Sequence, residues 1–356
     1  MRKDIPTEYQ ARISRWKTFL ILLVLLLFLS VFIALNIGFS QISLWNTARI
    51  LLKSVPLVGD LAQFSDVPAI EVTIIMQIRL PRILSAALVG AALAVSGAVY
   101  QGIFRNPMAD PYVIGASSGA ALGAALAIVL GLGFNFFGFN TVPLFAFFGC
   151  LFSVLLVYSI SRVGSRVPTA TLLLTGLSAS IFFSAIVTYL QTIAGERLHA
   201  LTFWLMGGFT YVEWIDLTSA LPFVVLGIGT VYLYARDLNL IAIGEDQAQQ
   251  LGVELEKTKF IVLLSSALMT AAAVSISGLI GFTGLIIPHI TRILIGPDHR
   301  ILIPASGILA AAFMIACDCL ARVLAAPAEL PVGVITAVFG GPFFIYLLRR
   351  KKRSSL

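Results

Sequence analysis

The sequence predicts an all-α, polytopic membrane protein of about ten transmembrane helices with a weak inverted repeat. The composition is the first reason: 59% of the 356 residues are hydrophobic and 12% are charged, whereas charged residues make up about a quarter of a soluble domain. The second is that apolar runs of about 20 residues recur, each long enough to cross the roughly 30 Å hydrocarbon core. We expect one transmembrane domain over 18–349, between an N-terminal tail (1–17) and a basic C-terminal tail (350–356).

The first span is expected at 18–36. A signal peptide is the competing interpretation, but the apolar run is long and no small-residue cleavage motif follows it. A polar connection over 38–78 comes next. Further spans are expected at 83–104, 112–132, 142–161, 171–194, 214–235, 260–277, 279–295, 301–323 and 332–348. The 279–295 segment is short and contains Gly281, Gly284 and Pro288, so it predicts a broken helix sheltered by protein.

The charge distribution predicts the orientation. Ten crossings put both termini on one side, and 18 of the 24 Lys and Arg fall on that side. By the positive-inside rule, we expect both termini and the 236–259 segment to be cytoplasmic, in the cell (inner) membrane. The net charge of +7 does not indicate nucleic-acid binding, because the basic residues gather at segment ends rather than in a stripe with aromatics.

Small residues recur every fourth position in two segments, which favours close helix packing. They are Ala86, Gly90, Ala94, Ala98 and Gly102, and then Gly115, Gly119 and Gly123. A faint internal repeat is also present: Ser96-Gly97 precedes Pro107 by the interval at which Ser277-Gly278 precedes Pro288. Because the halves enter the membrane from opposite sides, this repeat would be inverted, as in many transporters.

The polar segment 236–259 lies between two apolar runs and has the pattern of a short surface helix. Glu245 and Asp246 suit a helix N-terminus, and Gly252 suits a C-terminal stop. Ala248 and Leu251 fall three apart, which predicts a small exposed apolar face that docks on another protein. A solvated connecting loop is the alternative.

Several kinds of chemistry lack a sequence signal. No Gly-Lys dipeptide occurs, so there is no Walker A loop, and we expect no enzymatic activity, cofactor or metal site. Cys317-Asp318-Cys319 does not have zinc-ligand spacing. Asp318 and Arg322 lie four apart and can pair on one helix face. The remaining spans hold almost no ionisable groups, which argues against a proton relay.

Five motifs together resemble a known family, the permeases of bacterial and archaeal ABC importers for iron chelates, haem and vitamin B12. They are RLPR (79–82), SGAVYQGIFRNPMADPYVIGASSGA (96–120), GEDQAQQLG (244–252), SGLIGFTGLIIPHITR (277–292) and ELPVGVITAVFGGPFFIYLLRR (329–350). The resemblance implies a ten-helix subunit that forms a homodimer, binds two ATP-binding cassette ATPase subunits and receives substrate from an extracytoplasmic substrate-binding protein.

The resemblance also implies site residues. The segment Gly244 to Gly252, with Glu245, Asp246, Ala248 and Leu251, is similar to the helix that couples such permeases to the ATPase. Arg79, Arg82 and Arg322 match outer-face arginines that dock the binding protein; ordinary boundary arginines are the alternative. Asn106-Pro107 and Asp110-Pro111 resemble a loop near the cytoplasmic gate.

The translocation path is expected along two spans. Thr171, Thr175 and Ser178 form a hydroxyl-bearing face, and the resemblance places them with Gly340 and Gly341 on the path wall, although Ser and Thr also join helices. The substrate is expected to be a large metal chelate: a ferric siderophore, haem or a corrinoid. An ATP-independent secondary transporter or channel is the rival hypothesis, and a membrane-embedded enzyme is a third.

Overall fold

The computed structural model describes residues 5–38, 40, 42–53, 67–133, 140–164 and 166–354. Apart from a β-bridge between Val163 and Arg166, the regular structure of these residues is helical. The elements are α1 (Ile5–Asn36), α2 (Leu44–Lys53), α4 (Ala69–Thr73), the π-helix η1 (Ile74–Arg79), α5 (Leu80–Ile103), the 3₁₀-helix η2 (Pro111–Ile114), α6 (Ala116–Val129), α7 (Thr141–Ile160), α8 (Thr169–Ile193), η3 (Gly195–Arg197), α9 (Leu198–Met206), α10 (Trp214–Leu233), α11 (Ala235–Ile243), α12 (Glu245–Gln250), α13 (Leu255–Ser277), α14 (Thr283–Ile295), α15 (His299–Val323) and α16 (Val332–Ser354).

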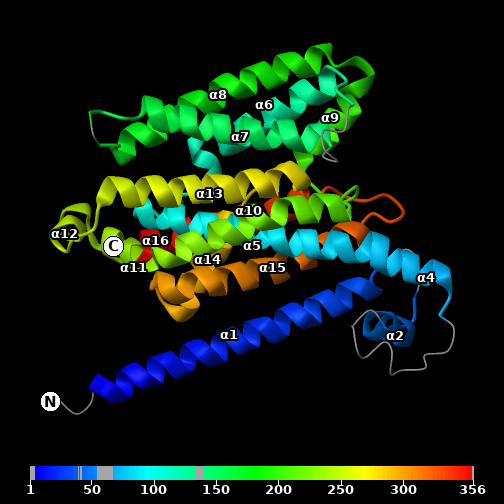
Figure 1. Ribbon diagram of the computed structural model, residues 1–356, viewed down its shortest axis with the longest axis horizontal. Helices are drawn as coiled ribbons and strands as arrows, with labels where there is room; N and C mark the ends of the chain where they lie inside the picture. The colour runs from blue at the N-terminus through cyan, green and yellow to red at the C-terminus, as the bar shows by residue number, and fades with distance from the viewer. Residues whose placement is uncertain are drawn as a thin grey trace.

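The predicted all-α polytopic fold is confirmed. Within the described residues, seven helices are long and apolar enough to cross a membrane, and the shorter apolar helices α6, α14 and α16 account for the other predicted spans. The long helices lie side by side, with α6, α7 and α8 on one side of α5, α10 and α13, and with α15 and α1 on the other (Figure 1). Both termini lie at the end of the bundle that carries α12, which we call the α12 end (Figure 1). Helices α2 and α4 lie at the opposite end, which we call the α2 end.

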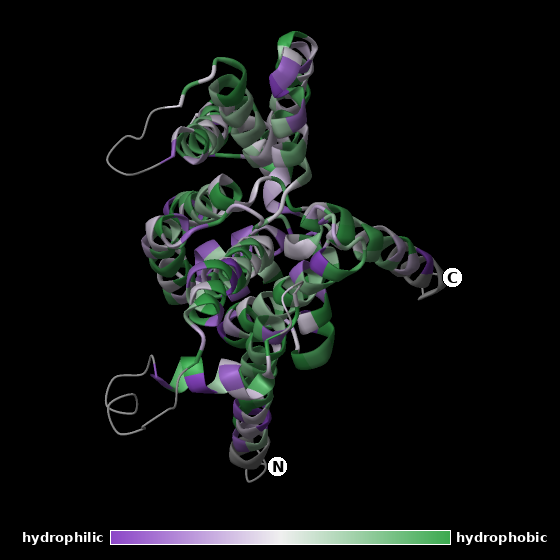
Figure 2. Ribbon diagram, turned by 90° about the vertical axis from the view of Figure 1, so that its right-hand side faces the viewer, coloured by the Kyte–Doolittle hydropathy of each residue, from purple (hydrophilic) through white to green (hydrophobic). Residues whose placement is uncertain are grey.

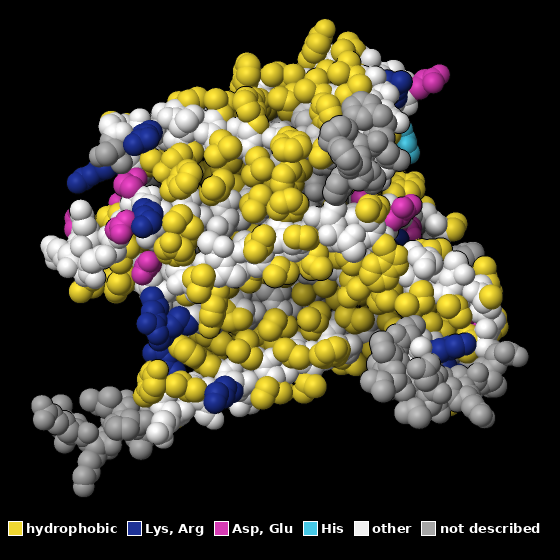
Figure 3. Space-filling view, in the orientation of Figure 1, with side chains coloured by type: hydrophobic (Ala, Val, Ile, Leu, Met, Phe, Trp, Pro, Cys, Tyr) yellow, Lys and Arg dark blue, Asp and Glu magenta, His cyan; other side chains and the backbone are white. Residues whose placement is uncertain are grey.

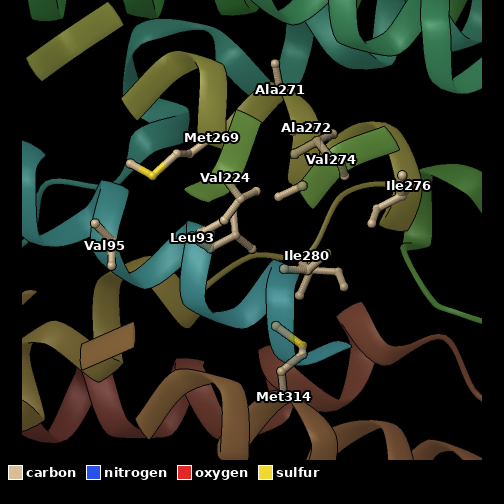
Figure 4. Packing of buried hydrophobic residues seen from close by; sticks show 14 of the residues in the cluster. Leu93, Val95, Val224, Met269, Ala271, Ala272, Val274, Ile276, Ile280 and Met314 are labelled. Atoms are coloured by element: carbon tan, nitrogen blue, oxygen red, sulfur yellow. The ribbon is translucent and has the colours of Figure 1, made fainter. Parts of the chain in front are cut away.

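Helix α5 is the centre of the bundle. It packs against α10, α13, α14 and α15, and Figure 4 shows Leu93 of α5 facing Val224 of α10 and the apolar side of α13. The predicted small-residue packing is confirmed, because a Cβ at Gly90 would collide with the Ala310 carbonyl on α15 and one at Gly97 with the Gly284 backbone. Apolar side chains also cover much of the exterior, as a lipid-facing surface requires (Figure 3).

The connections differ from the sequence-based expectation. The predicted polar connection 38–78 contains the helix α2, and the second span begins at Ala69 rather than at 83; the part of this connection at 54–66 lies outside the described residues. The π-helix η1 immediately precedes Pro81, whose missing N–H removes a helical hydrogen bond and favours a local change of winding. Helix α9 was not predicted.

The tails also differ. Helix α1 already begins at Ile5, inside the predicted N-terminal tail, and α16 continues to Ser354 in the predicted basic tail. Residues 1–4 and 355–356 of these tails lie outside the described residues.

Of the predicted interruptions within 279–295, Gly281 lies in a loop before α14, whereas Gly284 and Pro288 lie inside that continuous helix. Residues 278–282 separate α13 from α14; a Cβ at Gly278 would collide with the Trp204 carbonyl, and the Tyr112 hydroxyl donates to the Ile280 carbonyl at 3.0 Å. The two proposed repeat segments do not share local structure, because Pro107 lies in a loop whereas Pro288 lies inside α14. Nothing in the arrangement of these segments tests the inversion of the repeat, which stays a prediction.

Candidate functional site

The predicted short helix in the polar segment 236–259 is α12, between α11 and α13. Glu245 and Asp246 occupy its first turn, and Gly252 follows it with φ +90°, a left-handed conformation that favours glycine. The predicted exposed face is wrong for Ala248, which is fully buried against Ile241 and Val253. Leu251 is 67% exposed. The short α12 turns its small residue inward because α11 and the chain after α12 cover that side.

An ion-pair network attaches α12 to α13. The Lys259 ammonium, on the first turns of α13, donates to Glu245 at 2.8 Å and lies 3.9 Å from Glu256. The Lys259 side chain is only 4% exposed. Glu256 in turn accepts a hydrogen bond from the backbone N–H of Val167 at 3.0 Å, immediately before α8. The network therefore links α12, α13 and the start of α8.

A second polar cluster attaches α11 to the start of α15. Asn239 donates from Nδ2 to Asp298 at 2.8 Å, and its Oδ1 accepts from the His299 backbone N–H at 2.8 Å. Asp298 also accepts from Arg300 and from Arg12 of α1. Burial raises the pKa of Asp298, but hydrogen bonds from Arg300 and Asn239 outweigh it and lower the pKa to about 2. Asp298 therefore stays ionised and holds three elements together.

The three predicted docking arginines gather at the α2 end, but they do not present free charge. Arg79, Arg82 and Arg322 are all buried. Arg79 donates to the backbone carbonyls of Leu35 and Ser40, both at 2.6 Å, and so anchors the chain that follows α1. Acceptors within the chain satisfy these arginines, and their predicted role in docking a binding protein stays a prediction.

Asp318 and Glu329 are the acidic partners of this cluster. Arg82 contacts Asp318 at 2.8 Å and Glu329 at 3.0 Å, and the predicted pairing of Asp318 with Arg322 is confirmed at 3.2 Å. Glu329 also accepts from the Thr210 hydroxyl at 2.9 Å. Sequence reasoning quoted Glu329 within a motif but gave it no role. The charges thus join α5, α15 and two loops.

The predicted gate loop has the turn structure that its residues favour. The Asn106 side chain accepts from the Met108 N–H at 3.0 Å, and Asp110 caps η2 through the Tyr112 N–H at 2.8 Å. Pro111 occupies the first position of η2, where its missing N–H costs nothing. Pro107 completes the predicted set within the same loop.

This loop contacts α14 and α8, and α8 carries the predicted path residues Thr171, Thr175 and Ser178. The ring of Pro111 packs against Gly284 at the start of α14, and the backbone of Val113 and Ile114 packs against Gly176 of α8. A side chain at Gly176 would collide with the Val113 carbonyl. Glycine at position 176 therefore allows α8 to approach the backbone of this loop closely.

The predicted path residues occupy different environments. Thr171 and Thr175 are half-buried and Ser178 is exposed on α8, with its hydroxyl donating to its own helix. Gly341 has open space around it, but Gly340 is buried beneath the Phe282 ring. The expectation that Gly340 lines an open wall is wrong, because a neighbouring side chain already fills that position.

Two faces of α8 and α16 remain exposed in the single chain. Exposed apolar residues include Leu174, Ile181 and Phe182 on α8, and Val338 and Phe339 on α16. A cleft of about 510 Å³ lies between α9 and α16. Helix α16, which leads to the C-terminus, projects from the body of the molecule (Figure 2).

Known proteins resemble the chain over most of its length. A family model described as the FecCD transport family matches residues 23–350. The cobalamin import system permease protein BtuC of Halobacterium salinarum is 45% identical over 290 residues, which cover 82% of this chain and 77% of the relative. The hemin transport system permease protein HmuU of Yersinia pestis is 40% identical, covering 78% of this chain and 83% of the relative. A solved metal-chelate type ABC transporter in an inward-facing conformation has a TM-score of 0.79 at 34% identity, covering 94% of this chain and 99% of that chain.

Proposed function

The chain belongs to the FecCD transport family, and from this premise we propose that it is the transmembrane permease subunit of a binding-protein-dependent ABC importer for a metal chelate. The observation that carries the proposal is α12, a short helix with an exposed outer side that the Lys259 network ties to two long helices. The sequence contains no Walker A lysine, so two partner ATPase subunits would hydrolyse the ATP.

The outer side of α12 is the proposed ATPase contact. Asp246, Gln247, Gln249, Gln250 and Leu251 are exposed there. A displacement of α12 reaches α13 through Lys259 and the base of α8 through Glu256. This path lets nucleotide-driven closure of the ATPases tilt α8, and α8 carries the gate loop with it through Gly176.

The proposed docking of a binding protein uses the α2 end. Because Arg79, Arg82 and Arg322 are satisfied internally, their role in the proposal is to hold the surrounding loops in shape. Glu329, whose side chain is 34% exposed, marks the outer edge of this network. The positive-inside rule predicts that this end lies outside and that α12 lies in the cytoplasm.

The homodimer supplies the translocation path in this proposal. A second copy would cover the exposed apolar faces of α8 and α16, which pack against little within one chain. Thr171, Thr175, Ser178 and Gly341 would then lie near the shared axis. Since all three native cysteines are buried, a Ser178→Cys variant offers one exposed thiol, and a disulfide-linked dimer in membranes is the expected result.

The substrate proposal follows the relatives, which are named for cobalamin and hemin. Both are large metal chelates. The test is uptake of labelled cobalamin, hemin and ferric siderophore into vesicles that contain the permease, its ATPases and a binding protein. Uptake that requires ATP supports the importer, whereas uptake that persists with an inactive ATPase supports a secondary transporter.

The coupling role has a sharper test. Leu251→Asp places a charge on the exposed side of α12, so we expect a folded protein whose ATPase activity no longer drives uptake. Lys257→Gln is the matched control, since Lys257 and its partner Glu254 are both exposed in the same segment. Ala248→Asp is unsuitable because Ala248 is buried and the change would unfold α12 itself. Undiminished uptake by Leu251→Asp would contradict the proposed contact.

A further inference from the structure

Two arginines meet around one aromatic ring where α1 passes the start of α15. The guanidinium carbon of Arg12 lies 4.7 Å from the centroid of the Trp16 ring, and that of Arg300 lies 5.7 Å from it. Both arginines also bond Asp298. We name Arg12, Trp16 and Arg300 the interfacial arginine cluster. Lys and Arg side chains gather at this end, between α1 and the bundle (Figure 3).

The cluster carries surplus positive charge. Two arginines share the single carboxylate of Asp298, which also accepts from Asn239. The Arg12 side chain is 46% exposed and that of Arg300 is 37% exposed. A guanidinium has five N–H donors, so each arginine retains donors that point away from Asp298. The cluster can therefore bind a further anion from outside.

The surroundings are those of a membrane interface. Tyr9 and Tyr232 lie within electrostatic range of Arg300, and Trp and Tyr are enriched at the level of lipid headgroups. Immediately deeper, α1 exposes Ile21 and Leu22, and α10 ends at Leu233, which is 81% exposed. An anion bound here has an apolar surface directly beside it. A lipid could cover that surface with its acyl chains, whereas a small free anion could not.

We propose that the interfacial arginine cluster binds the phosphate of an anionic phospholipid, whose acyl chains lie along the exposed apolar side of α1. The two arginines supply charge-assisted hydrogen bonds to the phosphate oxygens. The bound lipid then joins α1 to α15 at the α12 end. This role does not depend on the transported substrate.

The test uses the full-length chain in nanodiscs of phosphatidylcholine with or without phosphatidylglycerol, followed by native mass spectrometry of the retained lipid. A basic residue near a membrane surface contributes about fivefold in affinity for anionic lipid. We expect Arg12→Gln to lower the retained ratio of phosphatidylglycerol to phosphatidylcholine about fivefold, and Arg12→Gln/Arg300→Gln to lower it about 25-fold. Arg162→Gln removes an exposed arginine that bonds its own loop, and should lower the ratio less than Arg12→Gln does.

A second measurement distinguishes binding of the whole lipid from binding of a phosphate group alone. In detergent, phosphatidylglycerol should raise the thermal midpoint of the wild-type chain, because a ligand that binds only the folded state stabilises it. Inorganic phosphate at the same concentration should not. An equal rise with inorganic phosphate, equal retention of both lipids, or equal ratios for Arg12→Gln and Arg162→Gln would overturn the proposal. If the double variant does not fold, Arg12→Gln alone decides, since Arg12 is nearly half exposed.

Discussion

Replacing Lys259 with Met tests whether the ion pair holds α12 in place. The Lys259 ammonium is buried and donates to Glu245 at 2.8 Å. A hydrogen bond between charged groups contributes about 1.5–3 kcal/mol, and water reaches Glu245, whose side chain is 30% exposed, so we expect about 1.5 kcal/mol. That free energy corresponds to roughly tenfold more frequent detachment of α12.

Hydrogen exchange measures this detachment directly. The Ala248 and Leu251 amides donate within α12 at 3.0 and 3.1 Å, and Lys259→Met should speed their exchange about tenfold. Lys257→Met removes an exposed pair, worth at most about 0.5–1 kcal/mol, and should leave α12 protected. Adding Glu245→Gln to Lys259→Met should change little, because both remove one interaction. Equal protection in wild type and Lys259→Met would refute the reasoning.

The remaining predictions concern the bundle and its charge network. Gly97→Ala places a methyl group against the backbone of α14, so we expect the free energy of unfolding to fall by about 1–3 kcal/mol or the protein not to fold. At Gly229 an added methyl group meets nothing within 4 Å, so Gly229→Ala should be neutral or stabilise the protein by about 0.5–1 kcal/mol. Thermal unfolding compares the pair. Arg82→Met leaves Asp318 buried with one partner fewer and should cost about 3 kcal/mol, whereas Glu329→Gln should cost under about 1 kcal/mol because water reaches Glu329. Equal costs for these two variants in denaturant unfolding would contradict the burial argument.

The spans could be predicted from the sequence because apolar length is a local property. Each predicted run corresponds to a helix, although at 279–295 only Gly281 marks the loop before α14, and Gly284 and Pro288 lie within the helix. Helix α2 was not predicted, although its residues have an amphipathic helical pattern, because its ten residues are too few to span a membrane. Hydrogen bonds from Thr47 to Asn36 and from Asn46 to Glu71 hold it against distant positions.

The position of the candidate site could be predicted from the sequence, but the orientation and partners of its side chains could not. The position of α12 follows from a polar segment between apolar runs, but six residues are too few for periodicity to show that Ala248 faces inward. The local pairing of Asp318 with Arg322 was predictable from their spacing. The pairing of Arg82 with Asp318 and Glu329 joins residues 236 and 247 positions apart, which no local pattern encodes.

Helix α12 divides its residues into two populations with separate constraints. Ala248 is buried and Glu245 bonds Lys259, and the Gln247 side chain lies against Gly244, whereas Gln249 and Gln250 are exposed. The exposed residues of α12 can consequently change in sequence without disturbing the packing of the helix. If α12 is the proposed ATPase contact, the exposed residues Asp246, Gln249, Gln250 and Leu251 could change with the partner while the buried attachment through Lys259 stayed the same.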